Sequence, residues 1–127
     1  MKRTGIFTAS LVALAALAVA APAVQAKGAP GTRIPLKSSG VFPGASGKAK
    51  FQNQGQRELE IEVEHVRRLA GKRVSFFVNR TKVGSARVSA LGAAQVIRRG
   101  ASFPAINPGT RIKVKTAGGK LIVSGRF

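Results

Sequence analysis

Strict alternation of apolar and charged residues in one short segment is the feature that most constrains this fold. Residues 57–66 read Arg-Glu-Leu-Glu-Ile-Glu-Val-Glu-His-Val, so Leu59, Ile61 and Val63 share one face and four glutamates share the other. A side-chain period of two belongs to a β-strand, whereas a helix repeats every 3.6 residues. The segment therefore predicts a strand with one buried side and one solvent-facing side.

The segment 47–53 predicts a partner strand for this one. Residues directly opposite each other in an antiparallel pair must share a face, which sets Phe51 against Leu59 and Ala49 against Ile61. This register leaves a three-residue loop whose central residue is a glycine, a common hairpin connection.

The same register aligns opposite charges on the outer face of the hairpin. Lys50 comes to lie opposite Glu60, and Lys48 opposite Glu62. Each such pair contributes from a few tenths to about 1 kcal/mol to a sheet. We therefore expect these four residues to form structural ion pairs, and two independent patterns agree on one register.

Period-two alternation continues through the rest of the chain and predicts further strands. Gly84 interrupts the alternation and predicts a bulge, and Leu121 and Val123 are expected to point inward near the end. Pro35 restricts a short extended piece, residues 32–37, to the edge of a sheet or to a segment outside any strand. The remaining predicted strands are residues 72–79, 83–88, 93–98, 110–116 and 120–127.

Seven to eight short strands separated by turn signals predict an all-β fold. The expected architecture is a single antiparallel β-sandwich, immunoglobulin-like in general shape, with a small barrel as the alternative. The chain contains no cysteine, so this fold has to be stabilised by packing without disulfides.

The N-terminal residues predict a secretory signal peptide. Lys2 and Arg3 precede an apolar run, residues 11–21, and small residues lead up to Ala26. Cleavage there leaves a mature chain beginning at Lys27, without a transmembrane anchor, in the periplasm or outside the cell. The expected organisation is signal peptide 1–26, a Gly/Pro/Ser-rich lead-in 27–46 with the candidate edge strand, and a sandwich domain 47–127.

The mature protein is expected to be strongly basic. Removing Lys2 and Arg3 from 22 basic residues leaves 20 against four acidic ones, a net charge of about +16. Such a field attracts polyanions and speeds association with them. A basic composition without a binding role, which keeps a small protein soluble, is the alternative explanation.

The basic stripe at the C-terminal end is the candidate anion-binding site. Arg111, Lys113 and Lys115 alternate along one strand, and Lys120 follows across the turn from Lys115. The expected partner is an anionic polymer or a cell-envelope surface. Nucleic acid is less favoured, because base stacking needs exposed aromatic residues and only Phe77 is expected to point outward.

Few residue types suited to catalysis are present. The chain has one histidine, His65, four glutamates, and no cysteine or tryptophan. We therefore expect no enzyme activity, no cofactor and no metal site, and a binding or envelope-structural role. Two alternatives stay open: a hydrolase or metal-dependent enzyme using His65 and the Glu58–Glu64 strand, and a purely structural protein that assembles through its strand edges, with an oligomeric state that is not set by the sequence.

Two stretches resemble known secreted domains. The run 43–51, followed by a turn and the alternating strand 59–63, resembles the opening of CHRD (chordin-type) domains. The segment 74–79 with Lys82-Val83-Gly84 resembles a hairpin of small secreted bacterial β-sandwich domains. The resemblance implies a β-sandwich, an extracellular setting and no enzymatic activity. CHRD domains usually carry a histidine-bearing segment after the second strand, where this chain has His65.

Overall fold

The computed structural model describes residues 31–127, so the predicted signal peptide, residues 1–26, lies outside the described residues. Eight antiparallel strands form one sheet in this part of the chain, which confirms the all-β prediction. The strands are β2 (Thr32–Ser38), β3 (Ser46–Gln52), β4 (Glu58–Glu64), β5 (Arg73–Val78), β6 (Thr81–Arg87), β7 (Ala94–Arg99), β8 (Arg111–Thr116) and β9 (Leu121–Arg126), and a short 3-10 helix, η3, covers Arg67–Leu69.

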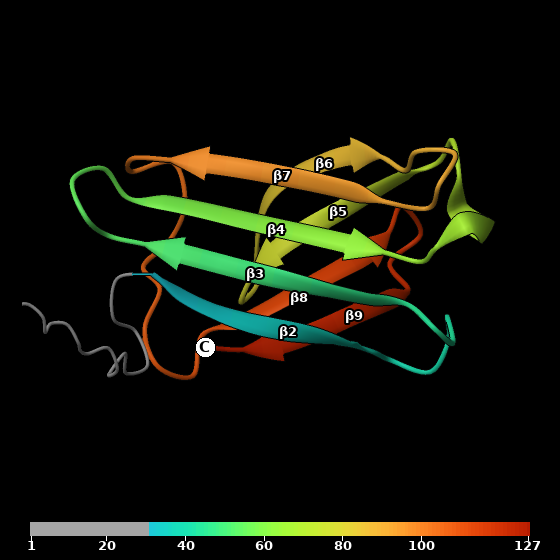
Figure 1. Ribbon diagram of the computed structural model, residues 1–127, viewed down its shortest axis with the longest axis horizontal. Coiled ribbons are helices and arrows are strands. Elements are labelled where there is room, and N and C mark those ends of the chain that lie inside the picture. The colour runs from blue at the N-terminus through green and yellow to red at the C-terminus, as the bar shows by residue number, and fades with distance from the viewer. Residues whose placement is uncertain (1–30) are drawn as a thin grey trace, which may run out of the picture.

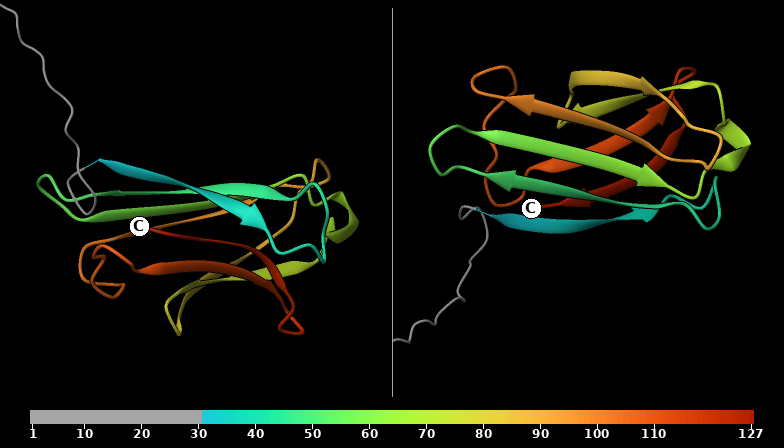
Figure 2. Two further views of the ribbon diagram at one scale, coloured as in Figure 1. Left: turned by 90° about the horizontal axis from the view of Figure 1, so that it is seen from below. Right: turned by 45° about the horizontal axis from the view of Figure 1, so that its top comes forward.

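The sheet folds over on itself into two layers. Its strand order is β6-β5-β8-β9-β2-β3-β4-β7. In Figure 1, β2, β3, β4 and β7 lie in front of β5, β6, β8 and β9, and the left view of Figure 2 shows the two layers edge-on. The end strands β6 and β7 approach each other, so the sheet is nearly closed and barrel-like, and both predicted architectures describe it.

The predicted register of the first hairpin is confirmed. Phe51 lies opposite Leu59 and Ala49 opposite Ile61, with the charged residues paired between them. The connecting loop turns at Gly55, whose φ of 70° lies in the left-handed region that glycine adopts without strain.

The alternating apolar residues of both layers make one core. Leu59, Ile61 and Val63 of β4 are completely buried. Burying an apolar side chain of this size contributes roughly 1.5–3 kcal/mol. The residues that meet them from the other layer are Val74, Phe76, Val78, Ile112, Val114, Ile122 and Val123.

Two bulges shift the strand register in the layer formed by β5, β6, β8 and β9, and the sequence predicts only one of them. The register between β5 and β6 shifts beside Gly84, as predicted. A second shift falls between β8 and β9, so Ile122 and Val123 are both buried and Leu121 is only half-buried. The prediction that Leu121 points inward is therefore wrong, because a bulge breaks the period of two.

The prediction that residues 32–37 form an edge strand is also wrong. Strand β2 pairs with β3 along its length and with β9 at Lys37 and Ser38. Pro35 is tolerated inside the sheet because the ladder to β9 does not extend to it, so its missing N–H costs no bond on that side. The sheet thus begins at Thr32, inside the predicted lead-in.

Candidate functional site

The outer face of one layer carries only basic charge. On β8, Arg111, Lys113 and Lys115 alternate with the buried Ile112 and Val114, so the strand period turns all three cations to the same side. Neighbouring strands add further cations to this side. We call this surface the basic face, and its charged residues are Arg73, Lys82, Arg87, Arg111, Lys113, Lys115 and Arg126.

One row of residues crosses the basic face from strand to strand. Phe77 of β5 lies between Lys82 of β6 and Lys113 of β8. On the other side, Lys113 lies opposite Ser124 of β9, which in turn pairs with Lys37 of β2. Strands are about 4.8 Å apart, so Lys82 and Lys113 are spaced roughly 10 Å from each other at their backbones, whereas Lys37 belongs to the other layer.

Like charges also lie directly opposite each other at the margins of this face. Arg111 pairs with Arg126, and Arg73 pairs with Arg87 of β6. Like-charged cross-strand neighbours destabilise a sheet. The face therefore concentrates positive charge at a cost to folding stability.

Repulsion among the cations of the basic face affects the pKa of Lys113. Partial burial lowers the pKa of its ammonium group, and the nearby charges of Lys115, Arg111 and Arg80 lower this pKa further. An anion bound beside Lys113 would offset this repulsion.

Phe77 is covered by a cation. The ammonium of Lys115 lies 5.1 Å from the centre of the Phe77 ring, within the range of a cation–π contact. The predicted outward position of Phe77 is thus correct, but its ring is half-buried beside Lys115.

Lys120 does not lie opposite Lys115, the position that the sequence predicts. Leu121, not Lys120, lies opposite Lys115. Lys120 instead closes the hairpin turn with Thr116 through two hydrogen bonds: its backbone N–H donates to the Thr116 side-chain Oγ1, and the Thr116 backbone N–H donates to the Lys120 carbonyl. Lys120 therefore lies at the end of the stripe formed by Arg111, Lys113 and Lys115.

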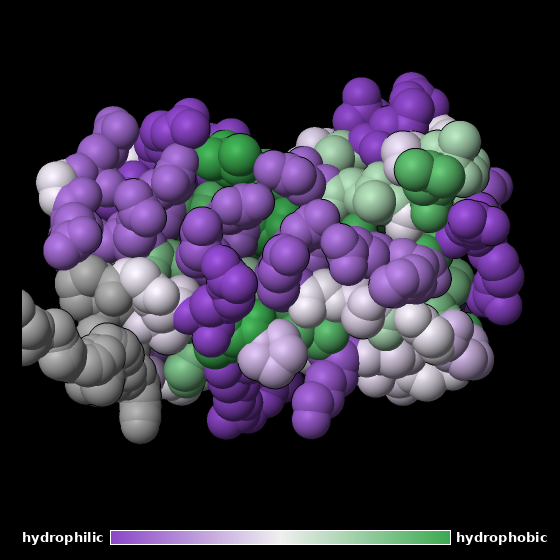
Figure 3. All heavy atoms as spheres, viewed as in Figure 1, coloured by the Kyte–Doolittle hydropathy of each residue, from purple (hydrophilic) through white to green (hydrophobic). Residues whose placement is uncertain are grey.

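The glutamates lie on the outer face of the opposite layer. Because β4 alternates strictly, its four carboxylates point away from the core, and hydrophilic side chains cover the surface around it in Figure 3. Lys48 Nζ lies 3.5 Å from Glu62 Oε1, which is one of the two expected ion pairs. Within residues 31–127 every acidic side chain belongs to β4.

The second expected pair has a different arrangement. Lys50 lies opposite Glu60 in the register, but the polar contact of the Glu60 carboxylate is with the Gln95 amide, which donates over 3.4 Å. An ion pair that the sequence did not suggest joins Arg99 Nε to Glu58 Oε2 at 2.9 Å. Strand β7 therefore shares the neutralisation of the glutamates with β3.

Burial is the main influence on the carboxyl group of Glu62. Desolvation raises its pKa, and the neighbouring Glu64 raises it further through a hydrogen bond and like charge. The ammonium of Lys48 acts in the opposite direction and lowers this pKa. Burial, together with the hydrogen bond and like charge of Glu64, therefore outweighs the effect of Lys48 on this pKa.

His65 lies just after β4 with a left-handed backbone, at a φ of 64°. Its Nδ1 lies 3.0 Å from Ser46 Oγ, so its hydrogen-bond partner is a hydroxyl and not a glutamate. In the described part of the chain, no three side chains of histidine, cysteine, aspartate or glutamate lie close enough together to hold a metal ion.

The sequence predicts the cations of β8 as part of the basic face, but it does not predict the cations that the neighbouring strands add. Arg73 and Arg126 belong to it because β5 and β9 flank β8, and Lys82 and Arg87 belong to it because β6 pairs with β5. The outward alternation of Arg73, Ser75 and Phe77 was a signal in the sequence, but the neighbours of β8 were not.

No family model, curated protein or solved structure matches this chain. The resemblance to CHRD domains therefore stays a prediction. No helix within residues 31–127 has the length and apolar character needed to span a membrane.

Proposed function

We propose that this protein is an exported, non-enzymatic module that binds anionic polymers through its basic face. The observation that supports this most directly is the confinement of the carboxylates to one of the two layers. All acidic side chains of residues 31–127 lie on β4, while seven cations share the outer face of the other layer without a carboxylate. A composition that merely favours basic residues would not need to place the acids on one strand.

The spacing of the cations suits an extended ligand. Lys82 and Lys113 lie about 10 Å apart across the strands, and cations recur about every 7 Å along β8. A flat array of this kind contacts several anionic groups of one chain at once, so weak individual contacts add up. Ser75, Ser85 and Ser124 add hydroxyl groups to the same surface.

The expected ligands are sulfated, phosphorylated or carboxylated polymers of a cell envelope or extracellular matrix. Nucleic acid fits less well, because Phe77 is covered by Lys115 and offers little surface for base stacking. Export is part of the proposal, and intact-mass analysis of the exported protein should give a chain that begins near Lys27. A mass that retains residues 1–26 would contradict it.

A salt-gradient retention assay with charge-matched variants tests the binding face. The variant Lys113→Gln/Lys115→Gln should elute from a heparin resin at lower salt than the wild type, with affinity lowered roughly tenfold at low ionic strength. The control Lys48→Gln/Lys50→Gln loses the same charge from the opposite layer and should elute close to the wild type. Exposed charges are screened within about 8 Å at physiological ionic strength, so binding should weaken steeply with salt.

Equal loss of retention in both variants would contradict the proposal, since bulk charge alone would then explain binding. A single-stranded DNA resin that retains the protein more strongly than heparin would favour the nucleic-acid alternative.

A further inference from the structure

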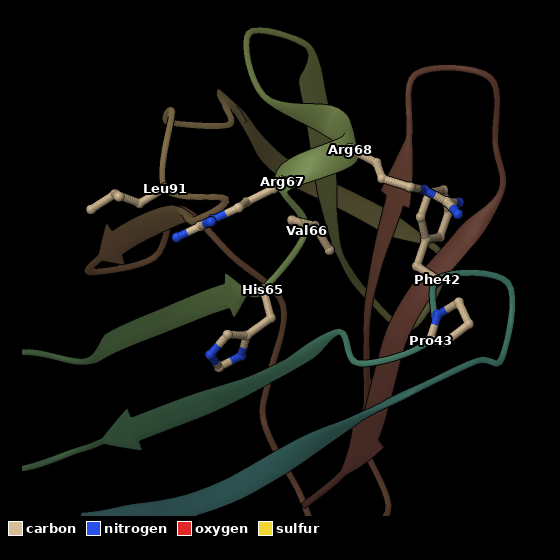
Figure 4. A pocket seen from close by; sticks show the side chains of 7 residues that line it. All are labelled: Phe42, Pro43, His65, Val66, Arg67, Arg68 and Leu91. Atoms are coloured by element: carbon tan, nitrogen blue, oxygen red, sulfur yellow. The ribbon is translucent and has the colours of Figure 1, made fainter.

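Three loops meet at one end of the sandwich and enclose a pocket of about 320 Å³. The β2–β3 connection supplies Phe42 and Pro43, the β4–β5 connection supplies Val66, and the β6–β7 connection supplies Leu91 (Figure 4). A volume of this size is at the lower end of the range of small-molecule sites. The basic face lies on the side of the molecule, so the pocket is a separate feature.

Specific contacts hold the three loops together. Val66 N–H donates to the Gly92 carbonyl over 3.0 Å, which ties the second loop to the third. A Cβ on Gly92 would lie 2.7 Å from the Arg67 backbone nitrogen, so this close approach requires glycine. Arg68 donates to the Val41 carbonyl over 3.4 Å and lies 4.9 Å from the centre of the Phe42 ring. The pocket is therefore formed before any ligand arrives.

The pocket has apolar walls that continue to an exposed apolar rim. Phe42 and Val66 are buried and form its inner part. Leu91 is 75 % exposed, and Val41, next to Phe42, is 49 % exposed. Figure 3 shows apolar atoms at the end of the molecule where the β6–β7 loop lies. Large apolar side chains gathered at one exposed place mark a site of interaction.

The ionisable side chains that line the pocket are two arginines and one histidine. Arg67, Arg68 and His65 line it, and no acidic side chain of residues 31–127 does. In Figure 4, Arg68 extends toward Phe42, whereas Arg67 extends toward Leu91. The guanidinium of Arg68 is engaged by the loop contacts described above, and that of Arg67 has no hydrogen bond or ion pair within the described residues. The guanidinium of Arg67 is therefore available to pair with an anionic group beside the apolar rim.

We propose that this pocket binds an anionic amphiphile, a small molecule with one apolar chain and one acidic head group. The chain would pack against Phe42, Val66 and Leu91, and the head group, a carboxylate or phosphate, would pair with Arg67. A pocket of about 320 Å³ matches a small molecule in size, and its combination of apolar walls and a free cation favours an amphiphilic ligand over a purely polar one. The proposal is independent of polymer binding by the basic face.

Calorimetric titration with decanoate, below the concentration at which it forms micelles, tests the proposal. Decanoate should bind the purified, folded protein saturably at one site, and decanol and a decyltrimethylammonium ion should bind at least tenfold more weakly. Amide NMR signals around Val66, Arg67 and Gly92 should shift with the titration. Leu91→Asn and Arg67→Gln should each weaken binding roughly tenfold, because one removes apolar contact and the other the paired charge.

Matched controls separate the pocket from general effects. Ile97→Asn changes another exposed apolar residue, on β7, and Lys113→Gln removes a charge from the basic face; both should keep decanoate affinity within about twofold. Because Leu91 is largely exposed, its replacement should leave the melting temperature unchanged.

Absence of saturable binding would overturn the proposal, as would equal affinity for the decyltrimethylammonium ion. A loss in Lys113→Gln as large as in Arg67→Gln would assign the effect to bulk charge and would also overturn it. Binding to vesicles of anionic phospholipid without binding to monomeric decanoate would identify a membrane contact instead and exclude the small-molecule site.

Discussion

At the scale of single residues, Arg57 holds the long β7–β8 loop against the sandwich. Its guanidinium donates to the carbonyls of Gly100, Phe103 and Pro104, at 2.8, 3.3 and 2.9 Å. The same group lies 4.0 Å from the centre of the Phe103 ring. One planar side chain thus satisfies three loop carbonyls and packs on an aromatic face, which a lysine cannot reproduce.

We expect Arg57→Lys to lower the free energy of unfolding by about 1–3 kcal/mol, because several charge-assisted hydrogen bonds are lost while the net charge stays the same. Urea unfolding followed by circular dichroism measures this change. Arg126→Lys is the control, since Arg126 is exposed at the end of β9, and it should change stability by less than about 0.5 kcal/mol. Equal effects in both variants would show that the guanidinium contacts of Arg57 add no stability.

Glu62 gives the fold a pH dependence whose sign follows from its raised pKa. The folded state holds a proton on this carboxyl group more strongly than the unfolded state does, so stability falls as the pH rises through and above the ordinary pKa of glutamate. Glu62→Gln removes this titration. The unfolding free energy of the variant relative to the wild type should therefore increase between about pH 4 and pH 7.

Unfolding of both proteins at several pH values checks this slope. Loss of the Lys48 contact changes the unfolding free energy of the variant by a constant amount above the titration range. Only the slope of the relative unfolding free energy against pH is therefore diagnostic. A relative stability that stays constant or declines with pH would contradict the expectation.

At the scale of elements, the β3–β4 hairpin is held together by close backbone packing as well as by its register. A Cβ on Gly47 would collide with the backbone carbonyl of Glu62 in β4, and it would lie 3.3 Å from a Leu36 methyl group in β2. Gly47 therefore permits β2, β3 and β4 to pack closely at this position.

Gly47→Ala should lower the free energy of unfolding by at least about 1–3 kcal/mol. The backbone carbonyl of Glu62 cannot move aside as a flexible side chain can. Thermal unfolding gives the measure. Gly118→Ala, in the β8–β9 turn, is the control, because its Cβ would meet nothing closer than 3.9 Å. A melting temperature of Gly47→Ala equal to that of the control would show that β3 and β4 separate without cost.

At the scale of the whole molecule, the seam between β6 and β7 is where the sheet fails to close. Strand β6 pairs only with β5, and β7 only with β4, within the described residues. Side-chain packing joins the two edges: a Cβ on Gly84 would lie 2.7 Å from Val96 Cγ2. The absence of a side chain at Gly84 therefore permits the close approach of the two edges.

Amide hydrogen exchange should distinguish this open seam from a closed barrel. Amides of β6 and β7 that face the seam lack ladder partners, and we expect them to exchange at least about tenfold faster than those of β3 and β4. Equal protection of β4 and the seam strands would mean that the edges are hydrogen-bonded to each other in solution.

The alternation of the sequence by itself determined the strands, their inward faces and the register of the first hairpin. These are local consequences of chain geometry, because a period of two assigns each residue to a face and facing residues must match. It also predicted that Arg111, Lys113 and Lys115 share one side of one strand. Even the bulge at Gly84 followed from a local break in the pattern.

Only the tertiary structure decided which strands are neighbours across the fold. The central position of β2, the arginines opposite each other on β8 and β9, and the contribution of Lys82 to the basic face depend on strand order, which period-two patterns leave open. The terminal pocket depends on it as well, since Phe42, Val66 and Leu91 come from three separate connections. Strand order minimises the free energy of the whole core, and no local pattern encodes that sum.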